Sequence, residues 1–115
     1  MPQYMLLLRD DGSAWGKMSP EDMQKAMERY MEWRQRPFCV GGKRLDSFTG
    51  KVMVKKDGKI SVTDGPFSES REVLGGYFTI VADNYDAAVK LSMDHPHVEF
   101  GTVEVREVAG MPEGD

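Results

Sequence analysis

Residues 62–80 read VTDGPFSESREVLGGYFTI and predict a loop that is followed by a strand. Its last part is rich in β-branched and aromatic residues and predicts a strand from Val73 to Ala82. Two adjacent glycines, Gly75 and Gly76, predict a β-bulge or a close backbone contact inside that strand. We expect one face of the strand to carry Leu74, Gly76, Phe78 and Ile80.

The residues before this strand predict a β-hairpin and a loop. In residues 50–65, GKVMVKKDGKISVTDG, apolar residues alternate with polar ones on both sides of Asp57 and Gly58. An Asp-Gly pair between two alternating runs is typical of a two-residue hairpin turn. The loop that follows starts with Asp64, Gly65 and Pro66, residue types that favour turns.

Two further strands are predicted near the ends of the chain. Residues 3–9 are apolar on both alternating faces, which is typical of a central strand covered on both sides. Residues 102–108, TVEVREV, place Val103 and Val105 on one face and Glu104 and Arg106 on the other. The segment around Gly41 and Gly42 is expected to be a turn.

Two helices are predicted between these strands. The first begins after Ser19, an N-cap candidate followed by Pro20, and ends near Gln35 because Pro37 follows. Its apolar stripe is expected to be core and consists of Met23, Ala26, Met27, Tyr30 and Met31. The second runs from Tyr85 to about Asp94, with Asp83 or Asn84 as its cap.

The element order predicts a single domain over residues 1–115 with an α+β fold. Its architecture is a ferredoxin-like sandwich: an antiparallel sheet with two helices on one face and an extra β-hairpin. The uncovered face carries Tyr77, Thr79 and Val81, which is too apolar for contact with water. We therefore expect a homodimer that forms through the sheet face.

Composition excludes several classes of protein. The chain has 115 residues with a net charge of −4 and no basic stripe, so we expect no direct contact with nucleic acid. No apolar run approaches the ~18 residues that cross a bilayer, so no membrane association is expected. The single cysteine, Cys39, cannot form an internal disulfide and predicts a reducing, cytoplasmic location. We expect it to be a half-buried structural thiol.

The segment DHPH, residues 94–97, contains the titratable candidates. His95 is the predicted general acid or base, because histidine titrates near neutral pH without assistance. A metal clamp of His95, His97 and Asp94 is an alternative, but this spacing is a weak pattern, and we predict no metal. Histidines in a solvated connector are the simpler alternative.

The open sheet face and the loop supply candidates for binding. Glu104 and Arg106 point together towards the proposed dimer, where they form a structural ion pair or hold a ligand. In the loop, turn formation accounts for Asp64 but less well for Phe67 and Arg71.

The motif TDGPFSESREVLGGYF, residues 63–78, resembles the signature of the YCII-related, or DGPF-domain, family. The resemblance also includes YMLLL in the first strand, Trp15 before SPEDM, and HPHVEFGTVEVREV at the end. It implies a dimeric α/β barrel, in which ferredoxin-like subunits pair through their sheets. In the YCII branch, a His near the start of the first helix pairs with an Asp after the second. Asp22 and His95 stand at those positions with their types exchanged, and Arg71 replaces the usual Lys.

Two functions follow from these observations. The first is a cofactor-free enzyme of the lyase, isomerase or hydrolase type, acting on a small polar or aromatic molecule at the sheet face. His95 would be its acid or base, oriented by Asp22 or Asp64, while Arg106 or Arg71 would hold an anionic group. Trp15, Phe67 and Tyr77 would form apolar walls. The alternative is a non-catalytic dimeric module that binds a ligand or a protein, linked to sigma-factor-type transcription regulation.

Overall fold

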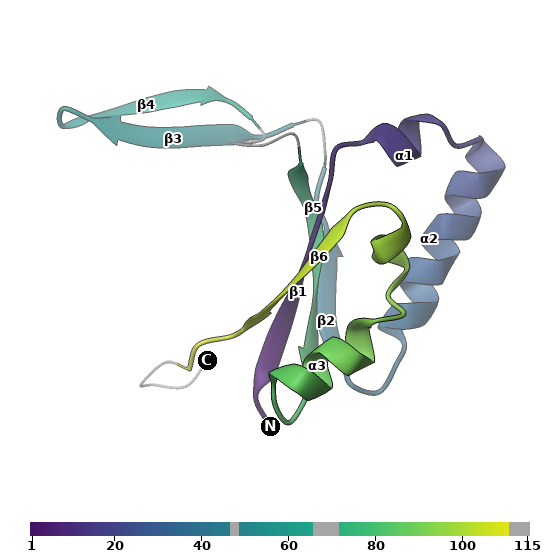
Figure 1. Ribbon diagram of the computed structural model, residues 1–115. Helices are drawn as coiled ribbons and strands as arrows, with labels where there is room; N and C mark the ends of the chain where they lie inside the picture. Colours follow the sequence, from purple (N-terminus) through teal and green to yellow (C-terminus); the bar gives the residue numbers. More distant parts are fainter. Residues whose placement is uncertain (47–48, 66–71, 111–115) are drawn as a thin grey trace.

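The computed structural model describes residues 1–46, 49–65 and 72–110. Within these ranges the fold is mixed α/β, with a four-stranded antiparallel sheet, three α-helices and a separate two-stranded hairpin (Figure 1). The helices lie on one side of the sheet, and the hairpin extends on the other side. The predicted Phe67 and Arg71 lie outside the described residues.

The sheet contains β1 (Gln3–Asp10), β2 (Cys39–Arg44), β5 (Val73–Val81) and β6 (Thr102–Glu107), in the order β2-β5-β1-β6. In its register, Leu6 of β1 lies opposite Phe78 of β5 and Val105 of β6. The first strand is central in the sheet as predicted, but the helices cover only one of its faces. In the last strand the predicted alternation is confirmed, with Val103 and Val105 less exposed than Glu104 and Arg106. The predicted turn at Gly41 and Gly42 is wrong, because both residues lie within β2.

A bulge in β5 changes which side chains face the helices. Leu8 pairs with Gly76, but the next residue, Arg9, pairs with Leu74, so the register skips Gly75. The predicted bulge is therefore confirmed, and Leu74 lies on the open face with Arg9 rather than on the face of Gly76 as predicted. A Cβ atom on Gly76 would lie 2.9 Å from the carbonyl oxygen of Lys43, so glycine also allows β2 to approach closely.

The predicted helices are present with the predicted caps. Helix α2 spans Pro20–Arg34, and Ser19 Oγ accepts a hydrogen bond from the backbone of Asp22. Helix α3 spans Tyr85–Ser92 and is capped by Asn84. A short helix α1 (Ser13–Gly16) occupies the predicted first loop, and a 3-10 helix η1 (Pro96–Glu99) follows α3.

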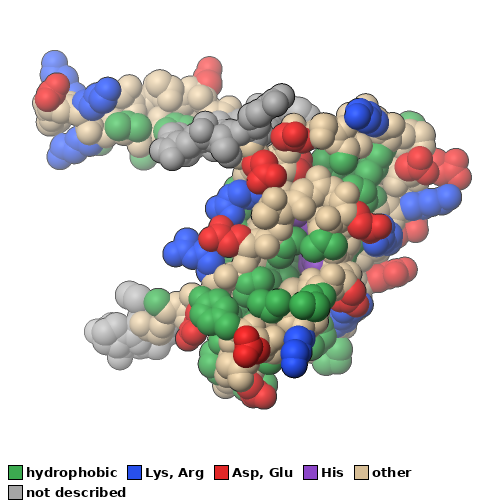
Figure 2. Space-filling view, in the orientation of Figure 1, with side chains coloured by type: hydrophobic (Ala, Val, Ile, Leu, Met, Phe, Trp, Pro, Cys, Tyr) green, Lys and Arg blue, Asp and Glu red, His purple; other side chains and the backbone are tan. Residues whose placement is uncertain are grey.

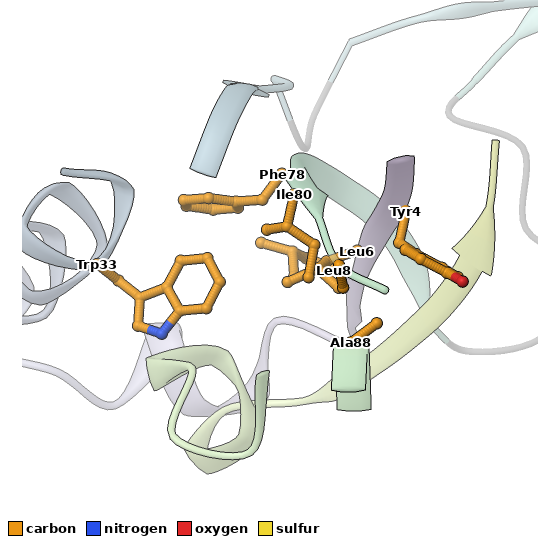
Figure 3. Close-up of a cluster of buried hydrophobic side chains, with 8 residues drawn as sticks. Tyr4, Leu6, Leu8, Trp33, Phe78, Ile80 and Ala88 are labelled. Carbon is orange, nitrogen blue, oxygen red and sulfur yellow. The ribbon is translucent and has the colours of Figure 1, made fainter. Parts of the chain in front are cut away.

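The core lies between α2, α3 and the sheet (Figure 3). Tyr4, Leu6 and Leu8 of β1 point into it, and the ring of Trp33 stands perpendicular to that of Phe78 at 5.5 Å. The predicted core stripe of α2 is only partly right. Met31 is 65% exposed, whereas Trp33 is 3% exposed, so the buried stripe is rotated around the helix from the predicted one.

The predicted hairpin is confirmed as β3 (Lys51–Lys56) and β4 (Lys59–Asp64). Asp57 and Gly58 form its turn with φ angles of 51° and 78°. The hairpin makes the molecule extended: its radius of gyration is 16.2 Å, against about 13 Å for a compact chain of this length. No helix in the described residues is long and apolar enough to span a bilayer. Cys39 is half-buried, as predicted.

Candidate functional site

A cavity of about 980 Å³ lies between α2, α1 and the helix-covered side of the sheet. Most of its walls are apolar, from Met23, Met27 and Met31 of α2, Trp15 of α1, and Phe78 of β5. Its polar lining residues include Asp10, Tyr30 and His97, which lie together, and also Asp11, Ser13, Arg34, Lys43 and Arg44. The prediction placed a pocket on the open face of the sheet, whereas this cavity is on the opposite face.

His97 lies on η1 and is held from both ring nitrogens. Its Nδ1 lies 2.6 Å from the hydroxyl of Tyr30, and its Nε2 lies 2.9 Å from the carbonyl oxygen of Arg9. A carbonyl oxygen can only accept, so Nε2 must carry the proton and donate it. Nδ1 is then the acceptor for the Tyr30 hydroxyl. The contacts therefore define one tautomer of His97. The residue is buried, with 3% of its surface exposed.

The absence of a side chain at Gly101 allows His97 to contact the backbone of β1. A Cβ atom at this position would lie 2.1 Å from the Arg9 carbonyl oxygen and 3.0 Å from His97 Nε2. A side chain there would push apart the two atoms that form the hydrogen bond. The glycine of the segment EFG, residues 99–101, is thus part of the site.

Asp10 supports the same pair from the end of β1. Its Oδ2 lies 3.8 Å from His97 Nε2, and its Oδ1 accepts a hydrogen bond from the backbone of Gly12 at 2.8 Å. Burial raises the pKa of Tyr30 well above its usual range, and the negative charge of Asp10 raises it further. Tyr30 is consequently a neutral hydroxyl at physiological pH and donates its proton to His97.

His95 lies behind this pair rather than in it. It is fully buried, with its ring 4.6 Å from those of Trp33 and Phe78. Its Nδ1 accepts the backbone N–H of His97 at 3.0 Å, and its Nε2 has no hydrogen-bond partner among the described residues. Burial, assisted by His97, lowers the pKa of His95 to about 4. The alternative of solvated connector histidines is wrong for both residues, because a 3-10 turn folds them inwards.

Asp94 is engaged in a different interaction. Its carboxylate accepts two hydrogen bonds from Arg36, at 2.8 and 2.7 Å, and one from the indole of Trp33 at 3.1 Å. The bonds from Arg36 are the main reason that its pKa falls to about 2. Within the described ranges, no group of three or more His, Cys, Asp or Glu side chains is arranged to hold a metal ion.

The structure separates the predicted catalytic residues. His95 is in the core, whereas Asp22 lies in the first turn of α2, about 12 Å along the helix axis from Tyr30. Asp64 is at the end of the hairpin strand β4, where it pairs with Lys51. Neither carboxylate is therefore brought to His95.

The predicted binding residues are also divided between two faces. Trp15 lies in the cavity, with its ring 4.8 Å from Phe100 and 6.0 Å from Tyr30. Glu104, Arg106 and Tyr77 lie on the open sheet face instead, because they pair in register with Leu7 or Met5 of β1. There Glu104 forms an ion pair with Arg9 of the neighbouring strand and not the predicted one with Arg106.

Sequence reasoning missed Asp10 and assigned Tyr30 to the core. A carboxylate at the end of an apolar strand was one available signal, and Asp10 is such a residue. A tyrosine within a stripe of methionines was another, because a buried hydroxyl needs a partner. His97 was visible in the same segment as His95, but only the turn of η1 distinguishes their environments.

Comparisons with known proteins place this fold in a family. Over 114 residues the chain is 30% identical to an uncharacterized protein of Rhizobium meliloti (strain 1021), covering 92% of this chain and 91% of that protein. Among solved structures it is similar to 5-chloro-2-hydroxyhydroquinone dehydrochlorinase from Burkholderia phenoliruptrix AC1100 in complex with 2,5-dihydroxybenzoquinone. That likeness has a TM-score of 0.47 and 11% identity over 98% of this chain and 99% of the other. The model of the YCII-related domain matches residues 2–112. The chain therefore belongs to the family of YCII-related domains.

Proposed function

We propose that the cavity binds a small, largely aromatic molecule that carries a hydroxyl group, and that Tyr30 and His97 move a proton at that group. The observation that carries this proposal is the 2.6 Å hydrogen bond between Tyr30 and His97 in the wall of an apolar cavity. A polar pair in apolar surroundings is typical of a small-molecule site, where few polar groups orient the ligand.

The walls favour a flat apolar ligand. Trp15 and Tyr30 offer ring faces and edges, and the three methionines have flexible side chains that adapt to an irregular shape. A volume of about 980 Å³ is at the upper end of the roughly 300–1,000 Å³ of ligand pockets. A single substituted ring would fit together with ordered water.

The hydrogen bonds determine the direction of proton transfer. The proton of Tyr30 is directed to His97 Nδ1, so the lone pairs of the Tyr30 oxygen are left to accept a bond from the ligand hydroxyl. When the ligand gives its proton to Tyr30 Oη, Tyr30 passes its own to Nδ1. The products are a ligand oxyanion and an imidazolium. Asp10, 3.8 Å from Nε2, stabilises the imidazolium.

This proton transfer supports an enzyme of the lyase, isomerase or hydrolase type. Enzymes of all three classes use general acid–base steps of this kind. In this proposal Tyr30 and His97 carry out the proton transfer that was predicted for His95 together with Asp22 or Asp64. A non-catalytic ligand-binding module would use the same cavity but would leave its ligand chemically unchanged.

The test uses para-nitrophenol, whose anion is coloured, as the probe. We expect the parent protein to raise the ionised fraction of bound probe, and Tyr30→Phe to bind it without that increase in absorbance. Tyr85→Phe is the matched control, because Tyr85 accepts a hydrogen bond from Glu107 and does not line the cavity. Equal absorbance for the parent and Tyr30→Phe would contradict the relay, and no binding by the parent would contradict the ligand class.

We further propose that the open sheet face pairs with a second copy, giving a dimeric α/β barrel of ferredoxin-like subunits. The strand order β2-β5-β1-β6 supports a ferredoxin-like subunit. Met5, Leu7 and Tyr77 support the pairing, because they remain partly exposed on the face that the helices do not cover.

A further inference from the structure

The β3–β4 hairpin has an apolar face that is exposed to solvent. Met53 and Val62 lie opposite each other on this face, and Ile60 lies beside them opposite Lys55. They are 71%, 58% and 65% exposed. A two-stranded hairpin alone is marginally stable in water, so side chains of this kind are expected to gain their stabilising contacts from another surface.

The hairpin points in a direction that suggests what this surface is. It leaves the sheet at the ends of β2 and β5 and extends to the side opposite the helices (Figure 1). Six residues per strand give it a length of about 20 Å. It therefore projects beyond the open sheet face, and a body packed against that face would lie next to the hairpin.

The area of the open face is smaller than the area that a stable interface buries on each partner, which indicates an additional contact. The four strands have six to nine residues, so the face measures roughly 24 by 19 Å, about 450 Å². A stable interface of standard size buries about 800 Å² on each partner. The open face alone would supply about half of this area, and the hairpin is placed to supply the remainder.

Charge supports a second copy of the same chain as the occupant. Residues 51–64 contain four lysines and two aspartates, a net charge of +2, whereas the whole chain has −4, so the remainder has −6. Figure 2 shows basic side chains gathered at the far end of the hairpin and acidic ones scattered over the body. A hairpin that reaches over another copy would place positive charge against a negative body.

We infer that the hairpin is an arm that clasps a second copy of this chain through the face of Met53, Ile60 and Val62. This inference rests on the proposed pairing of the open sheet faces, to which it adds a second contact region. Each arm would extend past the edge of the paired sheets and pack on the body of the partner. Two-fold symmetry would repeat the contact, so one substitution removes it twice.

The test measures the dimer dissociation constant by sedimentation velocity for two matched variants. Ile60→Asp places a charge on the clasping face, and Lys55 opposite can pair with it, so the hairpin itself is retained. Ser61→Asp adds the same charge to the other face of the same strand. We expect Ile60→Asp to weaken the dimer at least about tenfold, and Ser61→Asp to change it less than about twofold.

Two further measurements distinguish the arm from the sheet pairing. Leu7→Asp, in the middle of the open face, is expected to abolish the dimer. Hydrogen exchange in residues 51–64 is expected to slow as protein concentration rises. If Leu7→Asp abolishes the dimer but Ile60→Asp has no effect and exchange does not change, the arm inference fails and the sheet pairing stands. A chain that stays monomeric at every concentration overturns both.

Discussion

The helix-covered face of the sheet and the β3–β4 hairpin are both built from alternating apolar residues, yet they end in opposite environments. Leu6 and Ile80 are fully buried under α2 and α3, whereas Met53 and Ile60 are more than half exposed. The alternation determines the strands in both regions. The connections of the chain determine what covers each strand. The helical connections place α2 and α3 over one face of the sheet, whereas the turn between β3 and β4 contains no helix that could cover the hairpin.

This difference predicts a large contrast in stability. Trp33→Ala removes a buried ring that packs on Phe78 and donates to Asp94, and should lower the free energy of unfolding by about 3–5 kcal/mol. Val62→Ala in the hairpin should cost less than about 0.5 kcal/mol at concentrations where the chain is monomeric. Urea unfolding measures both. Similar losses for the two variants would contradict the division between core and arm.

The second prediction concerns how the free energy of unfolding changes with pH, which depends on the protonation of His95. The pKa of His95 is lowered from 6.5 to about 4, first by burial and then by His97. Between these values the unfolded state binds more protons than the folded state. The free energy of unfolding should therefore fall by about 3 kcal/mol as pH drops from 6.5 to 4. The contribution of His95 to this free energy should level off above pH 6.5.

The control for this prediction is His95→Gln, which removes the titrating group. Its free energy of unfolding should be lower at neutral pH but depend less on pH in the same window. Urea unfolding at several pH values measures the slope. If the parent and the variant had the same slope between pH 6.5 and 4, the buried neutral state of His95 would be disproved.

The smallest contrast compares two glycines. Gly101→Ala places a methyl group against the Arg9 carbonyl and His97, and should cost about 1–3 kcal/mol while weakening binding of para-nitrophenol. A methyl group at Gly110 would meet open space, so Gly110→Ala should change neither the free energy of unfolding nor the affinity for para-nitrophenol. Thermal unfolding with and without the probe measures both effects. An unchanged affinity in Gly101→Ala would show that the hydrogen bond of His97 to Arg9 does not shape the site.

Local rules predicted much of the fold from the sequence. The caps Ser19 and Asn84, the Asp57–Gly58 turn and the bulge beside Gly76 each depend on neighbouring residues, so short segments contain the information. The consequence of the bulge was not predicted, because skipping one residue moves Leu74 to the other face.

The site could not be predicted in the same way. Asp10, Tyr30 and His97 come from a strand end, a helix and a 3-10 turn, and only the tertiary fold brings them together. The apolar side chains that line the cavity look like core residues in the sequence, because the apolar stripe of a helix has the same pattern whether it packs on a sheet or lines a cavity. The choice between His95 and His97 depended on the turn at Pro96.

The central claim is that Tyr30 and His97 form a proton relay in the cavity, and nitrogen NMR of the histidine rings tests it most directly. In the free protein, His97 should be neutral with its proton on Nε2. Saturation with para-nitrophenol should add a proton at Nδ1 of His97, while His95 stays neutral. If His97 has its proton on Nδ1 in the free protein, or stays unchanged when the probe is bound, the relay does not exist.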